Sequence, residues 1–363
     1  MAKQVRPLRR GWTTGTCAAA AAKAAFAALV IGEFPDPVEV ALPRGERPSF
    51  ALAIARKDET SATAGVIKDA GDDPDVTHGA LILATVRAGP PGAGIKFRAG
   101  EGVGTITRPG LPLPPGQPAI NPVPRQMIRD GIAEIAAAAA IAADAEVEIA
   151  IPGGAALAEK TLNGRLGIVG GLSILGTTGI VVPYSCSAWI ASIRQGIDVA
   201  RAAGLTHVAA ATGRASEAAV QKFYGLPDIA LIDMGDFVGG MLKHLRKGPL
   251  PRVTIAGGVA KMTKLAQGLT DLHSSRGEVD LAALAALART AGGCETLCAR
   301  IANANTAAEV FALAKADGIA LGDAVARAAQ QTAAQLVAGR DIDVEIMLFD
   351  RDGNLAGRAP FAG

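Results

Sequence analysis

The sequence predicts a mixed α/β protein with two domains, an α+β domain over residues 1–155 and a parallel-sheet domain over residues 156–363. Length is the first observation, because 363 residues suffice for about two domains with a core each. Composition is the second: half of the residues are hydrophobic, only 4% are aromatic and 44 are glycine, which favours close helix–sheet packing. The third is the order of predicted strands and helices, which changes near residue 152.

The first part of the chain mixes short strands with two helices. Strands are predicted over residues 38–42, 49–56, 80–89 and 146–151, with a hairpin around residues 100–110. One helix follows Cys17 through a run of alanines, and the other begins after Pro124 and continues to residue 145. Because these elements do not alternate strictly, the pattern favours the α+β class.

The second part is regular. A glycine-rich segment, residues 152–165, is expected to bridge the domains. Strands at residues 179–183, 206–213, 228–235 and 253–258 are each followed by a helix. Helices over residues 280–338 then precede a final strand at residues 341–350. This alternation predicts a doubly wound parallel sheet.

Charge and hydropathy exclude several classes of protein. The 36 basic and 34 acidic residues leave a net charge of +2, which is too even for a broad nucleic-acid-binding face. The four cysteines do not form a disulfide framework and no secretory signal precedes the first motif, so we expect a cytoplasmic protein. Residues 166–183 carry no charge over almost the length of a membrane span. Their five glycines and short β-branched blocks instead predict two buried strands joined by a glycine-rich turn.

The stretch "TTGTCAAAAAKAA", residues 13–25, places hydroxyls and a glycine at the start of a helix. Thr14 or Thr16 can cap the first backbone N–H groups, and Gly15 permits a close approach to the backbone. Two interpretations remain open: a well-capped, closely packed helix, or an anion site of the kind that helix N-termini provide.

Three glycine-bearing corners lie where strands of the predicted parallel sheet end. They are residues 170–179, residues 211–217 and residues 255–261. Ligands of open parallel sheets bind beyond the carboxyl ends of the strands, so these corners are candidates for a nucleotide-like cofactor. None of them matches the GxGxxG or Walker A pattern, and glycines that only turn tight corners are the alternative.

An acidic cluster, "IKDAGDDPDVTHG", contains four aspartates and a histidine: Asp69, Asp72, Asp73, Asp75 and His78. A solvated turn, a cation site, and a role in orienting substrate or accepting a proton are all open for such a run. The calcium-loop spacing is absent. Cys294 and Cys298 share a helical face without a nearby histidine, which indicates buried small residues rather than zinc ligands. We therefore predict no metal site.

Six segments together resemble the cobalt-precorrin-5B C1-methyltransferases, a family of the anaerobic branch of cobalamin biosynthesis. They are "GWTTGTCAAAAAKAA", "VIKDAGDDPDVTHG", "GEGVGTITRPGL", "AINPVPRQMI", "NGRLGIVGGLSILGTTGIVVP" and "GLTDLHSS". The resemblance covers residues 8–275. It implies S-adenosylmethionine as methyl donor, a cobalt-containing macrocycle as the substrate that is methylated at ring carbon 1, and a Rossmann-like second domain. The cobalt belongs to the substrate.

This resemblance implies cofactor-binding, substrate-binding and catalytic roles for the candidate residues. We expect the cofactor on the second domain, held by Gly170, Gly171, Gly176, Thr177, Thr178, Gly179, Thr212, Gly213, Glu217 and Asp233. The macrocycle carries acetate and propionate carboxylates, for which we expect anion contacts from Thr13, Thr14, Gly15, Thr16, Lys23, Arg125 and Arg165. Proton handling at the macrocycle is expected from Asp72, Asp73 and His78.

Two rival functions remain on the sequence alone. A nucleotide-dependent oxidoreductase or kinase also uses glycine-rich turns on a parallel sheet, although its motifs are absent. A non-catalytic corrinoid carrier would need the anion contacts but no working cofactor site. The expected partner is a small-molecule corrinoid, with no nucleic acid and no membrane, and the sequence leaves assembly into a homo-oligomer open.

Overall fold

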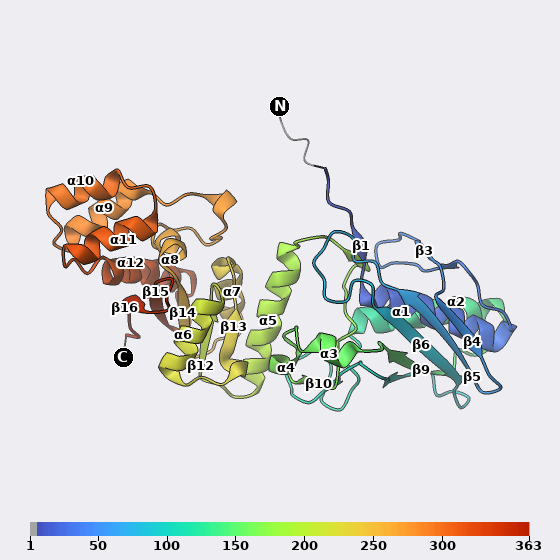
Figure 1. Ribbon diagram of the computed structural model, residues 1–363. Helices are drawn as coiled ribbons and strands as arrows, with labels where there is room; N and C mark the ends of the chain where they lie inside the picture. Colours follow the sequence, from blue (N-terminus) through green and yellow to red (C-terminus); the bar gives the residue numbers. More distant parts are fainter. Residues whose placement is uncertain (1–5, 363) are drawn as a thin grey trace. The chain divides into compact units, whose positions relative to one another are not determined.

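The computed structural model describes residues 6–362. The chain divides into two compact units, the first ending at Cys186 and the second beginning at Ser187 (Figure 1). Residues 156–186, which the sequence analysis assigned to the second domain, therefore belong to the first unit. Both units combine helices with sheets, as the mixed α/β class predicts.

The first unit contains a five-stranded sheet with the order β4-β5-β6-β9-β7. Its strands are β4 (Ile54–Lys57), β5 (Ser61–Ile67), β6 (Leu81–Ala88), β9 (Ala145–Ala150) and β7 (Ile95–Ala99). Neighbouring strands are antiparallel except β7 and β9. Buried and half-exposed residues alternate along β6 and β9, so one face of the sheet is packed against helices. Helix α1 contacts β5 and β6, and α2 lies beside α1 (Figure 1).

Helix α1 (Thr14–Ile31) is the centre of this core. Its residues from Thr14 to Ala28 are all buried, because the helix contacts β5 and β6 as well as α2 (Pro122–Ala138). Alanines give these elements room to pack closely. Among the described residues α1 is the one helix long and apolar enough to cross a membrane, but 83% of that window is buried within the protein, as in a core helix.

Helix α2 ends earlier than predicted. It stops at Ala138, and Ala140 then adopts a left-handed conformation with φ of 54°. The residues that follow are needed as strand β9, which pairs with both β6 and β7. Tertiary pairing therefore overrides the helical propensity of the alanine run.

The remaining elements of the first unit are short. They are β1 (Gly11–Trp12), β2 (Val38–Glu39), β3 (Ser49–Phe50), β8 (Thr105–Ile106), α3 (Gly154–Ala158), α4 (Asn163–Leu166), β10 (Ile168–Val169) and β11 (Ile180–Val181). The two strands predicted within residues 166–183 exist, but they do not pair with each other. Strand β10 pairs with β8, and β11 pairs with β1. The hairpin predicted around residues 100–110 is likewise replaced by the β8–β10 pair.

The second unit is built on a five-stranded sheet with the order β13-β12-β14-β15-β16. The strands are β12 (His207–Ala211), β13 (Leu231–Asp233), β14 (Arg252–Gly258), β15 (Asp343–Phe349) and β16 (Leu355–Ala359). The first four are parallel, as the alternating pattern predicts, and β16 is antiparallel to β15. The predicted strand at residues 179–183 is not part of this sheet, because β11 pairs in the first unit.

Helices surround this sheet. Those between the strands are α5 (Cys186–Ala202), α6 (Arg214–Tyr224), α7 (Val238–Leu245) and α8 (Val259–Ala266). The others are α9 (Leu281–Thr290), α10 (Glu295–Ala302), α11 (Ala307–Ala316) and α12 (Leu321–Leu336), with 3-10 turns η1 (Asp228–Ala230) and η2 (Ser274–Arg276). In Figure 1, α9, α10 and α11 form a group beside α12.

A polar network crosses the core of the second unit. The carboxylate of Glu345 on β15 is 0% exposed and accepts hydrogen bonds from Tyr224, Thr254 and Arg358 at 2.6–2.8 Å. Burial, together with the hydrogen bond to Glu345, raises the pKa of Tyr224 to about 12. Every group of the network is therefore satisfied, and the buried charge is paired.

Candidate active site

The N-terminus of α1 is closed by the chain itself. Thr13 caps the helix by accepting from the Thr16 N–H, and the Gly15 N–H donates to the Leu175 carbonyl at 3.1 Å. The Thr14 hydroxyl also donates to Leu175, and the Thr16 hydroxyl donates to Gly179 at 2.7 Å. These predicted substrate-binding residues are buried, so their donors serve an internal junction and do not form an open anion site.

Residues 170–179, predicted to bind the cofactor, form the other half of that junction. A Cβ on Gly176 would lie 2.5 Å from the Thr13 hydroxyl oxygen, and one on Gly179 would lie 2.9 Å from that of Thr16. A Cβ on Gly171 would lie 2.2 Å from the Gly102 carbonyl oxygen. These glycines thus allow close packing within the first unit. Gly170, Thr177 and Thr178 belong to the same unit, whereas Thr212, Gly213, Glu217 and Asp233 lie in the second.

All three predicted cationic contacts already have interaction partners. Lys23 forms an ion pair with Glu134 of α2 and donates to the Glu39 carbonyl at 2.9 Å. The Arg125 guanidinium donates to the carbonyl oxygens of Ile120 and Pro118 and to the Gln117 side chain, at 2.8–3.1 Å. Both therefore hold segments of the first unit together rather than presenting a free cation.

The third, Arg165, lies in the short helix α4 and is partly buried. It also belongs to the first unit.

The acidic cluster ties three segments of the first unit together. Asp69 binds the Arg9 guanidinium, and Asp72 accepts from the Arg9 N–H at 2.6 Å. The hydrogen bonds from Arg9 and from the Gly71 N–H lower the pKa of Asp69 to about 2. Asp73 accepts from the Tyr184 N–H at 2.9 Å. The residues predicted for proton transfer are thus used in fixing the backbone.

His78 has the same character. Its Nδ1 accepts a hydrogen bond from the Ala70 N–H at 3.1 Å, and the backbone N–H of His78 donates to the Asp75 carbonyl at 3.0 Å. Asp75 in turn pairs with Lys68, whose side chain is only 2% exposed. No group of three or more histidine, cysteine, aspartate or glutamate side chains within residues 6–362 is arranged to hold a metal ion.

The second unit presents the edge at which parallel sheets bind ligands. Strands β12 and β14 are neighbours in the sheet. The chain leaves β12 through α6 and adds β13 on the far side of β12, whereas after β14 it adds β15 on the far side of β14. This is the topological switch point of the sheet. Thr212 and Gly213 follow β12, and Gly257 and Gly258 end β14.

Glycines leave the backbone open at both corners of this edge. A Cβ built on Gly213 or on Gly258 would meet no atom within 4 Å. A Cβ on Gly257, in contrast, would lie 2.6 Å from the Met262 methyl and 2.9 Å from the Thr212 hydroxyl oxygen. The N-termini of α6 and α8 begin directly after these corners, so their dipoles favour negative charge there.

An ion pair fixes the edge. Lys261 of α8 donates to the Thr212 carbonyl at 3.0 Å and lies 2.9 Å from Asp236 Oδ1, which is buried and receives no well-aligned hydrogen bond from a described residue. Lys261 thereby connects the ends of β12, β13 and β14. Asp233 is the last residue of β13, and Glu217 stands in the first turn of α6.

The segment "GLTDLHSS" reaches the same edge. The Leu272 N–H donates to the Asp236 carbonyl, and the Gly239 N–H donates to the Thr270 carbonyl, both at 2.9 Å. The ammonium of Lys264, which is buried, lies 3.3 Å from the Leu272 carbonyl oxygen. Sequence reasoning missed Asp236 and the place of this segment. The position of Asp236, just beyond the end of a predicted strand, was the signal for it.

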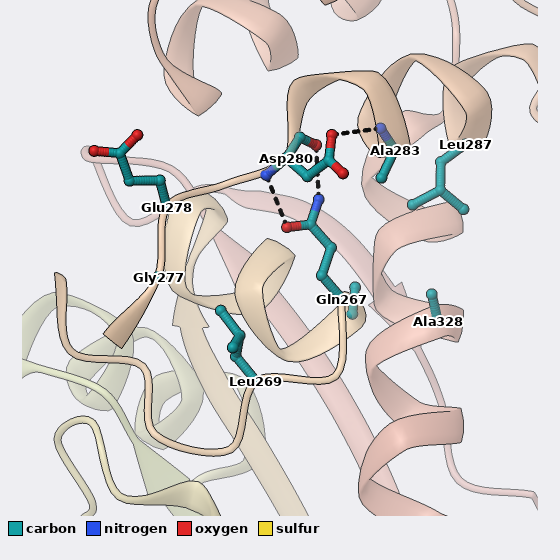
Figure 2. A pocket seen from close by; sticks show the side chains of 9 residues that line it. Gln267, Leu269, Gly277, Glu278, Asp280, Ala283, Leu287 and Ala328 are labelled. Carbon is teal, nitrogen blue, oxygen red and sulfur yellow. Dashed lines mark hydrogen bonds between the residues drawn. The ribbon is translucent and has the colours of Figure 1, made fainter. Parts of the chain in front are cut away.

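A separate groove of about 490 Å³ lies in the second unit and contains none of the predicted site residues. Figure 2 shows Gln267 and Asp280 joined by two hydrogen bonds across it, with Leu269 and Leu287 nearby. Asp280 also accepts from the Ala283 N–H and thereby caps α9. Gln267 and Asp280 therefore serve helix capping and loop closure.

The fold and the carboxyl edge define an α/β protein of the class that binds small ligands beyond the ends of parallel strands. Comparison with protein families places it more closely. Residues 1–183 match the family described as CbiD, and residues 271–360 match the CbiD C-terminal domain. The chain belongs to the CbiD family.

Relatives agree over almost the whole chain. Proteins from Agrobacterium fabrum, Bradyrhizobium sp. and Halorhodospira halophila are 65%, 64% and 62% identical to it, over 97%, 97% and 98% of this chain and 93%, 94% and 95% of their own. Each is named cobalt-precorrin-5B C(1)-methyltransferase. A crystal structure of a cobalamin biosynthesis protein (cbiD) from Archaeoglobus fulgidus is 28% identical, with a TM-score of 0.40 over 74% of this chain and 83% of that one.

Proposed function

We propose that this chain is a cobalt-precorrin-5B C1-methyltransferase, which transfers a methyl group to carbon 1 of a cobalt-containing precorrin in anaerobic cobalamin biosynthesis. One observation carries the proposal: relatives with that name are 57–65% identical over 97–98% of this chain. A match of this length includes both units. We would not expect a carrier or an unrelated nucleotide enzyme to share this identity over both units. The acceptor is a small corrinoid, and its cobalt is part of the substrate.

The methyl donor that we propose is S-adenosylmethionine, bound at the carboxyl edge of the second unit. The open backbone at Gly213 and Gly258 suits close approach of a nucleoside, and two helix N-termini favour the donor's carboxylate. The carboxylates of Asp233 and Glu217 suit the ribose hydroxyls. These features fit the group, and this Rossmann-like arrangement would place the donor on residues 187–363.

The residues predicted over 170–179 are left out of this site, because they belong to the first unit, where Gly176 packs on Thr13 and Gly179 packs on Thr16. By elimination we assign the first unit to the corrinoid. Its remaining predicted residues, Asp72, Asp73 and His78, are held by backbone hydrogen bonds, which supports a positioning role. Proton transfer by them stays a prediction.

The main contribution that this chain can make to such a reaction is to position the two reactants. The sulfonium of the donor supplies the activated methyl group when it is bound. Lys261 holds Thr212 and Asp236 in place, so the ends of three strands keep one geometry. Alignment of the two reactants and exclusion of water then lower the barrier to the displacement.

Calorimetric titration with S-adenosylhomocysteine tests the donor assignment, with NADH and ATP as controls. We expect binding of the sulfur nucleoside alone. We also expect the Asp233→Ala variant to bind it about tenfold more weakly, because the hydrogen bonds that one charged group makes are worth about 1.5–3 kcal/mol. Asp228→Ala is the matched control, because this exposed aspartate precedes β13 and so lies near the opposite end of that strand from Asp233.

Other outcomes separate the rivals. Selective binding of NADH or ATP would identify a nucleotide-dependent oxidoreductase or kinase. Binding of a corrinoid without any binding of S-adenosylhomocysteine would favour a carrier. Unchanged affinity of Asp233→Ala would remove Asp233 from the site while leaving the methyltransferase assignment intact.

A further inference from the structure

The backbone of the first unit is strained at one exposed aromatic residue. Tyr184 has φ of 55°, a left-handed conformation that bulky residues rarely adopt. The other non-glycine residue with positive φ within residues 6–362 is Ala140, just after the end of α2, where such a conformation is common. Tyr184 lies instead in a turn, two residues before α5 begins at Cys186. Strain of this kind persists where neighbouring contacts impose it, and it is frequent at ligand sites.

The contacts that impose it come from the acidic cluster. The carboxylate of Asp73 holds the Tyr184 N–H at 2.9 Å. The neighbouring Asp72 holds the Arg9 N–H, and its own N–H donates to the Arg9 carbonyl at 3.0 Å. The same cluster therefore positions two chain segments, residues 8–12 and residues 180–184, against each other.

Glycines make this positioning rigid. A Cβ on Gly11 would lie 2.0 Å from the Ala70 carbonyl carbon, and one on Gly71 would lie 2.2 Å from the Arg9 carbonyl oxygen. The two backbones thus touch without side chains between them. Gly11 pairs in turn with Val181 in the β1–β11 ladder. Arg10, before Gly11, and Val182, after Val181, consequently lie at the same end of this ladder.

The side chains presented here point to a ligand of mixed character. Tyr184 is 68% exposed, Leu8 54% and Val182 47%, which is unusual for residues of this kind within one small area. Arg10 forms no hydrogen bond or ion pair with any described residue, although Arg9 beside it is fully engaged. We call Leu8, Arg10, Val182 and Tyr184 the Tyr184 surface.

We propose that the Tyr184 surface is the docking surface for the corrinoid, with the Tyr184 ring against the macrocycle and Arg10 paired with a peripheral carboxylate. This rests on the proposed function, which supplies a broad apolar ring edged by acetate and propionate groups. The charge and shape correspond: an unpaired guanidinium matches a carboxylate, and an aromatic ring with aliphatic neighbours matches the ring system. Tyr184 and Arg10 are positioning and specificity residues, and the acidic cluster fixes their backbone.

Binding of cobyrinic acid, a stable cobalt corrinoid with free carboxylates, tests the proposal when followed by absorption spectroscopy. We expect Arg10→Gln to weaken binding about tenfold, because it removes a charge-assisted pair. The same variant should leave binding of the heptamethyl ester of cobyrinic acid unchanged, since the ester has no carboxylate to pair. Arg56→Gln, an exposed arginine on β4, is the matched control and should bind both probes normally.

The ring is tested by three substitutions at one position. Tyr184→Phe should bind cobyrinic acid as the unaltered chain does, and Tyr184→Ala should bind it about tenfold more weakly, a typical loss for an aromatic platform. Tyr184→Gly should also bind weakly, yet its melting temperature should not fall, because glycine relieves the positive φ. A merely structural tyrosine would instead lose stability on becoming glycine.

S-adenosylhomocysteine binding, measured in parallel, separates this inference from the proposed function. Normal binding of both ligands by the Arg10 and Tyr184 variants would overturn the docking surface and leave the methyltransferase assignment standing. Failure of the unaltered chain to bind cobyrinic acid would also overturn it. Failure of the unaltered chain to bind S-adenosylhomocysteine would count against the donor assignment alone.

Discussion

At the scale of single residues, the acidic cluster shows how position in space gives a residue its role. Lys68 is 2% exposed, and its ammonium contacts Asp75 and Thr77. Burial alone would raise the pKa of Asp75, but Lys68 and the hydrogen bonds from Thr77 outweigh it, so the pKa lies below its usual value. The acidic cluster, for which a solvated turn was one interpretation of the sequence, therefore contains a largely buried ion pair.

Asp75→Asn should destabilise the first unit by about 3 kcal/mol, because it leaves the Lys68 charge buried without a counter-charge. The pH dependence follows from the lowered pKa. The unaltered chain should keep this contribution above pH of about 4, the unfolded pKa, and lose it as the pH falls through the folded one. Urea unfolding of both chains at pH 6 and pH 3, followed by Trp12 fluorescence in a Trp189→Phe background, measures the difference.

The control is the double variant Lys68→Met, Asp75→Asn. It removes both charges and should recover part of the lost stability, since no unpaired charge remains buried. An equal loss in the single and double variants would contradict the ion-pair explanation.

At the scale of elements, α1 explains why the sequence is so rich in alanine. The helix packs on β5, β6 and α2, and all its side chains from Thr14 to Ala28 are buried. An amphipathic pattern is absent because the helix has almost no solvent face. Small side chains let three elements approach it closely, and its N-terminal donors are taken up by residues 175–179.

Ala20→Leu should destabilise the first unit by about 1–3 kcal/mol, because a larger side chain has no room in this core. Ala133→Leu on α2 is the matched control: that position is exposed, and the change should stay within about 0.5 kcal/mol. The midpoints of urea unfolding, again reported by Trp12, provide the comparison. A tolerated leucine at residue 20 would mean that α1 is less tightly packed than the structure indicates.

At the scale of the whole molecule, the two proposed sites lie in different units. The second carries the open sheet edge with Gly213, Gly258 and the Lys261–Asp236 pair. The first carries the rigid junction beneath the Tyr184 surface. Each unit also contains one tryptophan, Trp12 in the first and Trp189 in the second, so their unfolding can be followed separately.

S-adenosylhomocysteine at about 100 times its dissociation constant should stabilise the second unit by about 2.7 kcal/mol, because only the folded state binds it. Trp189 fluorescence in a Trp12→Phe background should show this shift during thermal unfolding, and Trp12 in the Trp189→Phe background should show none. Stabilisation of the first unit alone would contradict the assignment of the donor to residues 187–363.

The sequence by itself determined the class, the family and the parallel sheet. Long unusual segments such as residues 166–183 identify a family because many positions agree at once, and the comparisons confirm it. Regular alternation over residues 206–258 likewise predicts parallel pairing, since each helix must return the chain to the same edge of the sheet.

Only the tertiary structure decided which of the glycine-rich and charged segments are open to a ligand. Residues 13–16 and 170–179 look like binding loops, yet they satisfy each other's donors over about 160 positions of sequence separation. Arg9 and Arg10 are the same residue type, but Arg9 is paired with Asp69, whereas Arg10 has no partner among residues 6–362. A local pattern reports which hydrogen bonds and charges a segment can offer. Which of them remain available depends on the partners that folding brings from elsewhere in the chain.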